Sequence, residues 1–216
     1  MRSVVPGWLF LVLVFLTRCA AQTPAPAQPA QAIQTDRNVT GQILCYAINS
    51  PDIIYVGTSD GIFRSTDAGK TWIALAQDLV DQAVHSINLS ERTVFAATEG
   101  VGILRSTDDG NQWGPANTGV STKYILSIAI DGTRVFAGTT NGGVFMSENA
   151  GANWLDVHEG LPKDANVYSL AVVGATIYAG TQRGVFTSPS SSLRWSKITD
   201  MHQPPVPAMW TDRIVP

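Results

Sequence analysis

The stretch Ser65-Thr66-Asp67-Ala68-Gly69-Lys70-Thr71-Trp72 decides the fold, because the chain repeats it at a fixed interval. Successive copies place their Ser and Trp residues 41 positions apart each time. The further copies are Ser106-Thr107-Asp108-Asp109-Gly110-Asn111-Gln112-Trp113, Ser147-Glu148-Asn149-Ala150-Gly151-Ala152-Asn153-Trp154 and a degenerate Ser188-Pro189-Ser190-Ser191-Ser192-Leu193-Arg194-Trp195. A fixed period of this length indicates a repeat architecture.

The pattern Ser-x-Asp-x-Gly-x-x-Trp has a physical reading as a turn. The Asp67 side chain can bond backbone N–H groups ahead of it, Gly69 can take a positive φ without a Cβ clash, and Trp72 can anchor the turn to the body of the fold. We predict the same structural roles for Ser65, Ser106, Asp108, Gly110, Trp113, Ser147, Asn149, Gly151, Trp154, Ser188 and Trp195. The degenerate fourth turn predicts that losing Trp195 costs less stability than losing Trp113.

This pattern resembles the Asp-box, or BNR repeat, of sialidase-like β-propellers and of propellers similar to the photosystem II stability/assembly factor. The resemblance covers residues 43 to about 198. It implies a structural box on a turn of each blade, on the face opposite the usual ligand site. Sialidase activity is not implied, because Arg64 and Arg105 occupy matching repeat positions and the Arg-Ile-Pro signature of sialidases is absent.

Each repeat has the same internal order of short apolar strands. The first strands are expected at 43–48, 84–89, 125–130 and 167–172, the second at 54–57, 94–97, 135–138 and 177–180, and the third at 61–64, 102–105, 143–146 and 184–187. The box then leads into a fourth strand that carries the Trp. Evenly spaced short strands predict an all-β protein, and four strands per repeat predict four blades of a β-propeller.

The number of blades leaves three arrangements open. Propellers have four to eight blades, so the four repeats predict a compact ring, an open arc or truncated product, or an arc completed by a second copy of the chain. An open arc would expose an apolar blade face, which favours association. The segment 37–42 and the tail with Met209 and Trp210 are candidate covers for such a face.

The N-terminal residues predict export. The apolar run from Val4 to Leu16 follows Arg2 and is too short to span a bilayer, so residues 1–21 are expected to be a signal peptide cleaved after Ala21. A lipobox-like Leu16-Thr17-Arg18-Cys19 leaves lipidation at Cys19 as a rival, and only then would the protein contact a membrane. The predicted location is the periplasm or the exterior.

Composition bounds the remaining domains and partners. Residues 22–42 are expected to be a Pro/Ala/Gln-rich linker, 43–200 the repeats and 201–216 a Pro-rich tail. Cleavage would remove Arg2 and Arg18 and change the net charge from −3 to −5, so no nucleic-acid partner is expected. It would also remove Cys19, which leaves Cys45 as a buried thiol that behaves like a small hydrophobic residue.

The face opposite the boxes carries the candidate ligand residues. Strand connectivity places Asp60, Glu99, Asn141, Gln182 and Arg183 on that face, near the axis of the arc. Around them lie Asp78, Asp81, Asn117, Lys123, Glu159, Lys163 and Asp164. Asp60 and Glu99 could serve as the carboxylates of a glycosidase. The alternative is that they are solvated turn residues without a chemical role, because turns favour such residues in any case.

No catalytic, metal-binding or cofactor motif is evident in the sequence. His85, His158 and His202 fall in unrelated places, and neither a phosphate loop nor a nucleophile triad is present. The sequence therefore predicts an exported non-catalytic β-propeller module that presents loops to a protein or glycan partner. A glycoside hydrolase, or a remnant of one, is the alternative, and self-association is a further expectation.

Overall fold

The computed structural model describes residues 39–76, 82–141 and 143–199. It is an all-β structure in which consecutive strands form four antiparallel sheets, called blades 1 to 4 here. Blades 1 and 2 consist of β1 (Ile43–Ile48), β2 (Ile54–Thr58), β3 (Gly61–Ser65), β4 (Ile73–Leu75), β5 (Val84–Ser90), β6 (Thr93–Thr98), β7 (Ile103–Ser106) and β8 (Gly114–Pro115). Blades 3 and 4 consist of β9 (Ile125–Asp131), β10 (Arg134–Thr139), β11 (Val144–Ser147), β12 (Leu155–Asp156), β13 (Val167–Val173), β14 (Thr176–Thr181), β15 (Gly184–Pro189) and β16 (Ser196–Lys197).

The predicted all-β class and the four-stranded repeat are confirmed. First, second and third strands lie within one or two residues of their predicted bounds. The fourth strands differ, because each begins one residue after its Trp, so the Trp belongs to the turn. The expected signal peptide, most of the linker and the C-terminal tail lie outside the described residues. The described part contains no helix with the length and apolar character needed to span a membrane.

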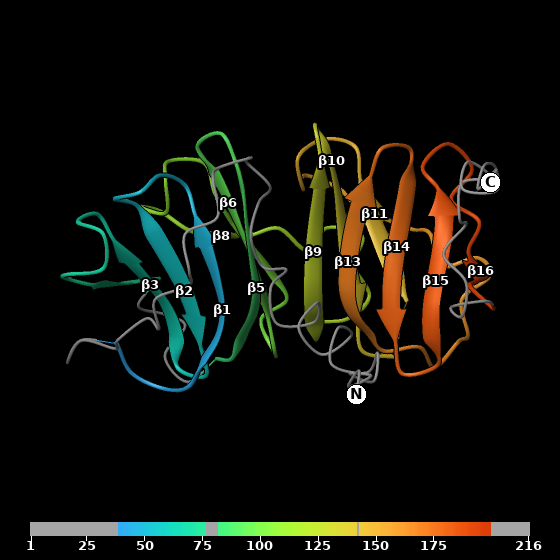
Figure 1. Cartoon of the computed structure of the whole chain (residues 1–216), viewed down its shortest axis with the longest axis horizontal. Helices are drawn as coiled ribbons and strands as arrows, with labels where there is room; N and C mark the ends of the chain where they lie inside the picture. The colour runs from blue at the N-terminus through green and yellow to red at the C-terminus, as the bar shows by residue number, and fades with distance from the viewer. Residues whose placement is uncertain (1–38, 77–81, 142, 200–216) are drawn as a thin grey trace, which may run out of the picture.

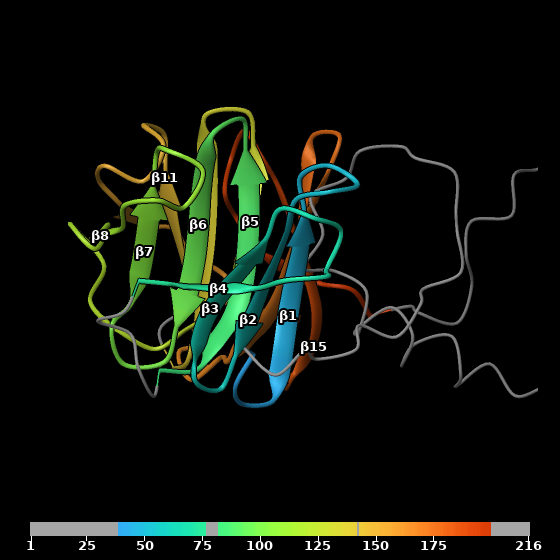
Figure 2. The same ribbon diagram turned by 90° about the vertical axis from the view of Figure 1, so that its left-hand side faces the viewer.

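The four blades form an open arc. Figure 1 shows blade 1 at one end and blade 4 at the other, with the first strands β1, β5, β9 and β13 side by side in between. Packing joins β1 to β5, β5 to β9 and β9 to β13, and no comparable packing joins β1 to β13 in the described ranges. Figure 2 shows blade 1 lying across blade 2. The described residues therefore form no closed four-bladed ring.

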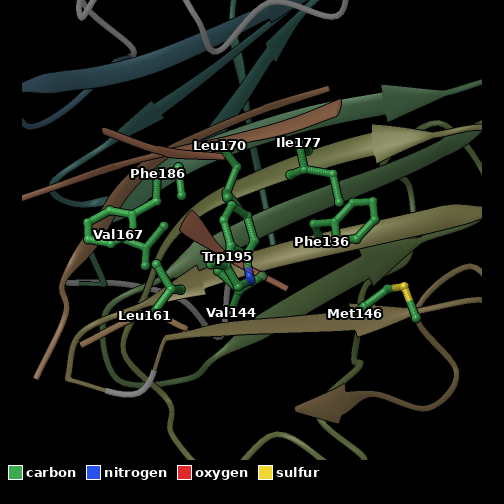
Figure 3. Close-up of a cluster of buried hydrophobic side chains, with 11 residues drawn as sticks. Phe136, Val144, Met146, Leu161, Val167, Leu170, Ile177, Phe186 and Trp195 are labelled. Carbon is green, nitrogen blue, oxygen red and sulfur yellow. The ribbon is translucent and has the colours of Figure 1, made fainter. Parts of the chain in front are cut away.

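Most of the hydrophobic core lies between blades, in three repeated junctions, and a fourth buried cluster of Val56, Phe63 and Trp72 lies in blade 1. The second-strand aromatics Tyr55, Phe95 and Phe136 are buried against the next blade. Figure 3 shows the junction of blades 3 and 4, where Phe136 and Trp195 lie among aliphatic side chains of both blades. Because each blade contributes two apolar faces, its core depends on its neighbours, as in other repeat proteins.

An arginine fastens each blade to the turn of the next. Arg64 of β3 donates to the Asp109 carbonyl, and Arg105 of β7 donates to the Ala150 carbonyl at 2.8 Å. Blade 3 has Met146 at this position, and Arg134 of β10 donates instead to the Ser190 carbonyl at 3.0 Å. These guanidinium groups are engaged in joining blades, which explains why an arginine repeats in the third strands.

Small residues allow the first strands to approach one another. A Cβ on Gly57 would lie 2.8 Å from the Val84 backbone of the next blade, and one on Gly138 would lie 2.6 Å from Val167. The Cys45 thiol donates to the Val84 carbonyl at 3.3 Å, and the Ser127 hydroxyl donates to the Val167 carbonyl at 3.0 Å. Cys45 thus sits in a junction, buried and bonded to the next blade.

The box turns are closed by the bonds that their sequence predicts. In blade 2, the Ser106 hydroxyl accepts from Gly110 N at 2.8 Å, and the Asp108 carboxylate accepts from Gln112 N at 2.8 Å. Blades 1 and 3 repeat this with Asp67 and Asn149. These backbone bonds lower the pKa of Asp108, and bonds from Thr71 lower that of Asp67 to about 2.

The indole rings of the boxes are held in two ways, which the sequence did not indicate. Trp154 and Trp195 donate to carbonyls of the preceding blade, at Ala116 (2.8 Å) and Val157 (2.7 Å). Trp113 donates to Gly110 of its own turn at 2.9 Å and is only half-buried. Trp195 is therefore the better anchored of the pair, which opposes the expectation drawn from its degenerate turn.

Candidate functional site

Hydrogen bonds divide the loops between two ends of the arc. At one end, box turns bond to first-to-second strand turns, as Ala68 N does to the Asp52 carbonyl at 3.0 Å. At the other end, second-to-third strand loops bond to the segments that enter each blade, as Glu99 N does to Ala83 and Thr140 N does to Tyr124. This second end, called the loop face here, holds Asp60, Glu99, Asn141 and Arg183.

A threonine at the end of each second strand shapes the loops of the loop face. Its hydroxyl donates to the carbonyl of the glycine that opens the third strand, for example from Thr98 to Gly102 at 2.8 Å and from Thr139 to Gly143 at 3.1 Å. Both glycines have positive φ, a conformation that carries no Cβ penalty for glycine. These tight loops hold the residues between the threonine and the glycine in fixed positions on the loop face.

Each first strand contains a bulge just below the loop face. The register shifts between Ile43 and Cys45, between Val84 and Ser86, and between Val167 and Ser169, with a matching irregularity opposite Thr139. A bulge frees a side chain from the alternation of the strand and re-aims it. The residues released in this way are Leu44, His85, Leu126 and Tyr168.

One polar cluster joins blades 2 and 3. His85 Nε2 lies 3.0 Å from the Glu99 carboxylate, and Glu99 forms a β-bridge with Tyr124 of the segment entering blade 3. The Tyr124 side chain is 51% exposed. The cluster therefore presents an ion-pairing group and an aromatic surface next to one another.

A second polar network joins blades 3 and 4. Asn166 accepts from Asn141 N at 3.0 Å, and its own N donates to Gln182 at 2.6 Å. Gln182 donates to the Asp164 carbonyl at 2.6 Å, and Arg183 pairs with the Asp164 carboxylate. The Arg183 bond lowers the pKa of Asp164, so this carboxylate is held charged. The network fixes the side chains before any ligand arrives.

The structure brings some of the predicted residues together and leaves others apart. Asn141 and Arg183 belong to one network, whereas Glu99 belongs to the other cluster. Asp60 lies in blade 1 and accepts from the Ser59 hydroxyl at 2.7 Å. Asp78 and Asp81 lie outside the described residues, and Asn117 bonds to Ile103 N and the Val101 carbonyl within blade 2.

Sequence reasoning missed the aromatic and histidine members of the loop face. Tyr168 is 50% exposed and accepts from the Asn166 side chain at 3.4 Å. His85 lies inside a predicted apolar strand and Tyr124 directly precedes another, and only the bulge and the bridge place them on the loop face.

The chemistry of the loop face suits binding through hydrogen bonds, charge and aromatic contact. Among the described residues, no group of three or more His, Cys, Asp or Glu side chains is placed to hold a metal ion. Arg64 and Arg105 are engaged at blade junctions and so do not form a carboxylate clamp at the loop face.

Comparisons with known proteins establish the fold. No protein-family model matches the chain, and no curated protein sequence matches it. Among solved structures, an ancestral GH74 enzyme matches with a TM-score of 0.64 and 22% identity over 77% of this chain and 25% of its own. The extracellular domain of BT4673 from B. thetaiotaomicron, a putative one-component system, matches with a TM-score of 0.61 and 18% identity over 76% of this chain and 23% of its own.

A third similar structure is YCF48 bound to a D1 peptide, with a TM-score of 0.58 and 18% identity over 77% of this chain and 56% of its own. The chain thus spans between about a quarter and just over half of the length of these three structures. They support a β-propeller fold for the four blades, and they include an enzyme as well as a protein solved with a bound peptide.

Proposed function

We propose that the chain is an exported, non-catalytic β-propeller module of the Asp-box type that binds a protein partner on its loop face. The observation that carries the proposal is the pairing of exposed aromatic rings with a pre-ordered polar network. Tyr124 and Tyr168 are each about half exposed, and the Asn166–Gln182–Asp164–Arg183 network lies beside Tyr168. Tyrosine and arginine are favoured contact residues in protein interfaces.

Two further observations support a peptide or protein ligand. YCF48, which has a similar fold, was solved with a D1 peptide bound. The similar domain of BT4673 is an extracellular one. Blades fix the loops and loops make the contacts, so rigid presentation is the mechanism. Export rests on the expected signal peptide at residues 1–21.

Site-specific photo-crosslinking tests this proposal. A photoreactive phenylalanine analogue at Tyr124 should capture a stoichiometric protein from the envelope fraction, and the same analogue at the exposed Leu155 of β12 should not. The Tyr124→Ala/Tyr168→Ala double variant should lose that partner while keeping its near-UV circular dichroism spectrum. Equal capture from both positions would overturn the proposal.

A glycoside hydrolase is the second candidate, favoured by the similarity to a GH74 enzyme and by the carboxylates Asp60 and Glu99 on the loop face. In the folded chain, Asp60 is bonded to Ser59 and Glu99 to His85. Hydrolysis of a fluorogenic glucoside or sialoside by the mature chain, lost in Asp60→Asn or Glu99→Gln, would establish this function in place of the first.

A further inference from the structure

At the last two junctions, a tryptophan of the incoming blade closes the core over the blade before it. The side of a blade that receives the next blade is called its receiving face here. At the junction of blades 3 and 4, Trp195 lies in one buried cluster with Phe136 of β10 and Val144 of β11 (Figure 3). An incoming indole is therefore a regular part of a filled receiving face. The same three positions at the junction of blades 2 and 3 are Trp154, Phe95 and Ile103.

The incoming indole is anchored to a carbonyl just after the fourth strand of the preceding blade. The Trp195 indole N–H donates to the Val157 carbonyl at 2.7 Å. Ile198 stands 41 positions after Val157, and its N–H donates to the Val185 carbonyl at 2.9 Å, just as Val157 bonds within blade 3. Blade 4 therefore repeats the backbone position that accepts the indole at the other junctions.

The receiving face of blade 4 is only partly covered. Tyr178 and Val185 occupy the positions of Phe136 and Val144, as the strand register shows. Phe136 and Val144 are 0% exposed, whereas Tyr178 and Val185 are only half-buried. Val173 lies on the same face and is 53% exposed. An apolar cover is therefore missing from this face among the described residues.

Blade 1 shows how the chain covers the opposite end of the arc. Val56, Phe63 and Trp72 lie on the side of blade 1 that faces away from blade 2, and they are at most 5% exposed. Val39, which precedes β1, packs against this cluster. Terminal repeats need such covers, because no neighbouring repeat buries their outer side. A segment that flanks the repeats thus contributes to the cover at one end.

The segment that follows blade 4 has the length and the side chains to cover the other end. Trp210 lies twelve residues after Ile198, a separation that spans about 40 Å when extended. The four strands of a blade, spaced by about 4.8 Å, need only about 15 Å. Prolines in between favour extended backbone. The prolines are Pro204, Pro205 and Pro207, and the apolar residues of the segment include Met209, Trp210, Ile214 and Val215.

We propose that residues 200–216 fold back over the receiving face of blade 4 and act as its cap. The Trp210 indole lies on Tyr178 and Val185, and its N–H donates to the Ile198 carbonyl, so that it takes the place of an incoming box tryptophan. The cap leaves the loop face free, because the receiving face is the flat side of the blade and not its loop end. The inference is independent of the partner proposed for the loop face.

Exchange of indole N–H protons with water, followed by ¹⁵N NMR on the mature chain, tests the proposal. Trp210→Phe identifies the Trp210 signal by its loss. In the wild type, the Trp210 N–H should exchange slowly, as the bonded N–H of Trp195 does. Tyr178→Glu places a charge on the receiving face and should speed exchange at Trp210 several-fold. Ala175→Glu is the matched control, because it adds the same charge to blade 4 at an exposed turn position, and it should leave the exchange at Trp210 unchanged.

A second variant keeps the proposal testable if Tyr178→Glu does not fold. Trp210→Ser leaves the sequence of the repeats intact and should lower the urea midpoint, whereas Thr211→Ser beside it should not. Rapid exchange at Trp210 in the wild type would overturn the proposal, as when the linker before Val39 covers the face instead. Protection that is lost on dilution would also overturn it, because a second copy would then supply the contact. So would equal urea midpoints for Trp210→Ser and Thr211→Ser.

Discussion

Alanine at the three box glycines should separate backbone strain from blade packing. Gly69, Gly110 and Gly151 have φ of +86°, +81° and +80°, so alanine meets the same left-handed penalty of about 1–2 kcal/mol at each. Their surroundings differ, because the nearest atom of a preceding blade would lie 3.1 Å from a Cβ on Gly110 and 2.7 Å from one on Gly151. Among the described residues, the atom within 4 Å of a Cβ on Gly69 belongs to Trp72 of the same turn, at 3.7 Å.

Overpacking a filled core costs about 1–3 kcal/mol, and the Phe95 ring beside Gly151 is buried. Gly151→Ala should therefore lose about 1–3 kcal/mol more stability than Gly69→Ala, with Gly110→Ala between them. Urea denaturation at two protein concentrations measures these losses and separates any contribution of self-association. Shortening the ring with Phe95→Leu should recover part of the Gly151→Ala loss. Equal losses at the three positions would refute the account in which an aromatic ring of one blade packs under the box turn of the next.

The remaining predictions concern the indole anchors, the arginines and acid stability. Trp154→Ala should lower the free energy of unfolding by about 3–5 kcal/mol, and Trp113→Ala should lower it clearly less, as measured by urea denaturation. The reason is that Trp154 is buried and bonded to the preceding blade, whereas Trp113 is half-buried. Arg105→Met, which copies Met146 of blade 3, should lower stability by about 1–3 kcal/mol by leaving the Ala150 carbonyl without its partner, and an unchanged urea midpoint would contradict this. The pKa of Asp67 is lowered to about 2 in the folded chain, from an ordinary 3.8. The unfolded chain therefore binds protons more readily than the folded chain does. The stability that Asp67 contributes above about pH 4 is lost as the pH falls toward about 2. Asp67→Asn with Asp108→Asn, which copies the asparagine that blade 3 carries at Asn149, should flatten that loss in chemical denaturation across this range.

Much of the fold could be predicted from the sequence because the repeat is a local property. The spacing of Ser106 and Trp113 from their counterparts fixes the blade length, and alternation of apolar residues fixes the strands. The bonds of Asp108 and Ser106 within the turn follow from the residue types alone, since donor and acceptor lie four residues apart.

The loop face was predictable only in part. Topology places Glu99, Asn141 and Arg183 at one end of the arc, because loops between second and third strands all emerge there. Their partners depend on register and on bulges, which shift the pairing by one residue. His85, Tyr124 and Tyr168 therefore entered the site only once the strands were paired.

The sequence by itself determined the all-β repeat, the box turns and the end of the arc at which loops gather, because these follow from contacts within one repeat. The tertiary structure decided what happens between repeats. The arginines at 64 and 105 turned out to fasten blades, Trp195 proved better anchored than Trp113, and the arc stayed open between blades 1 and 4. Contacts between residues 38 to 45 positions apart carry no local pattern, so only the packed chain could reveal them.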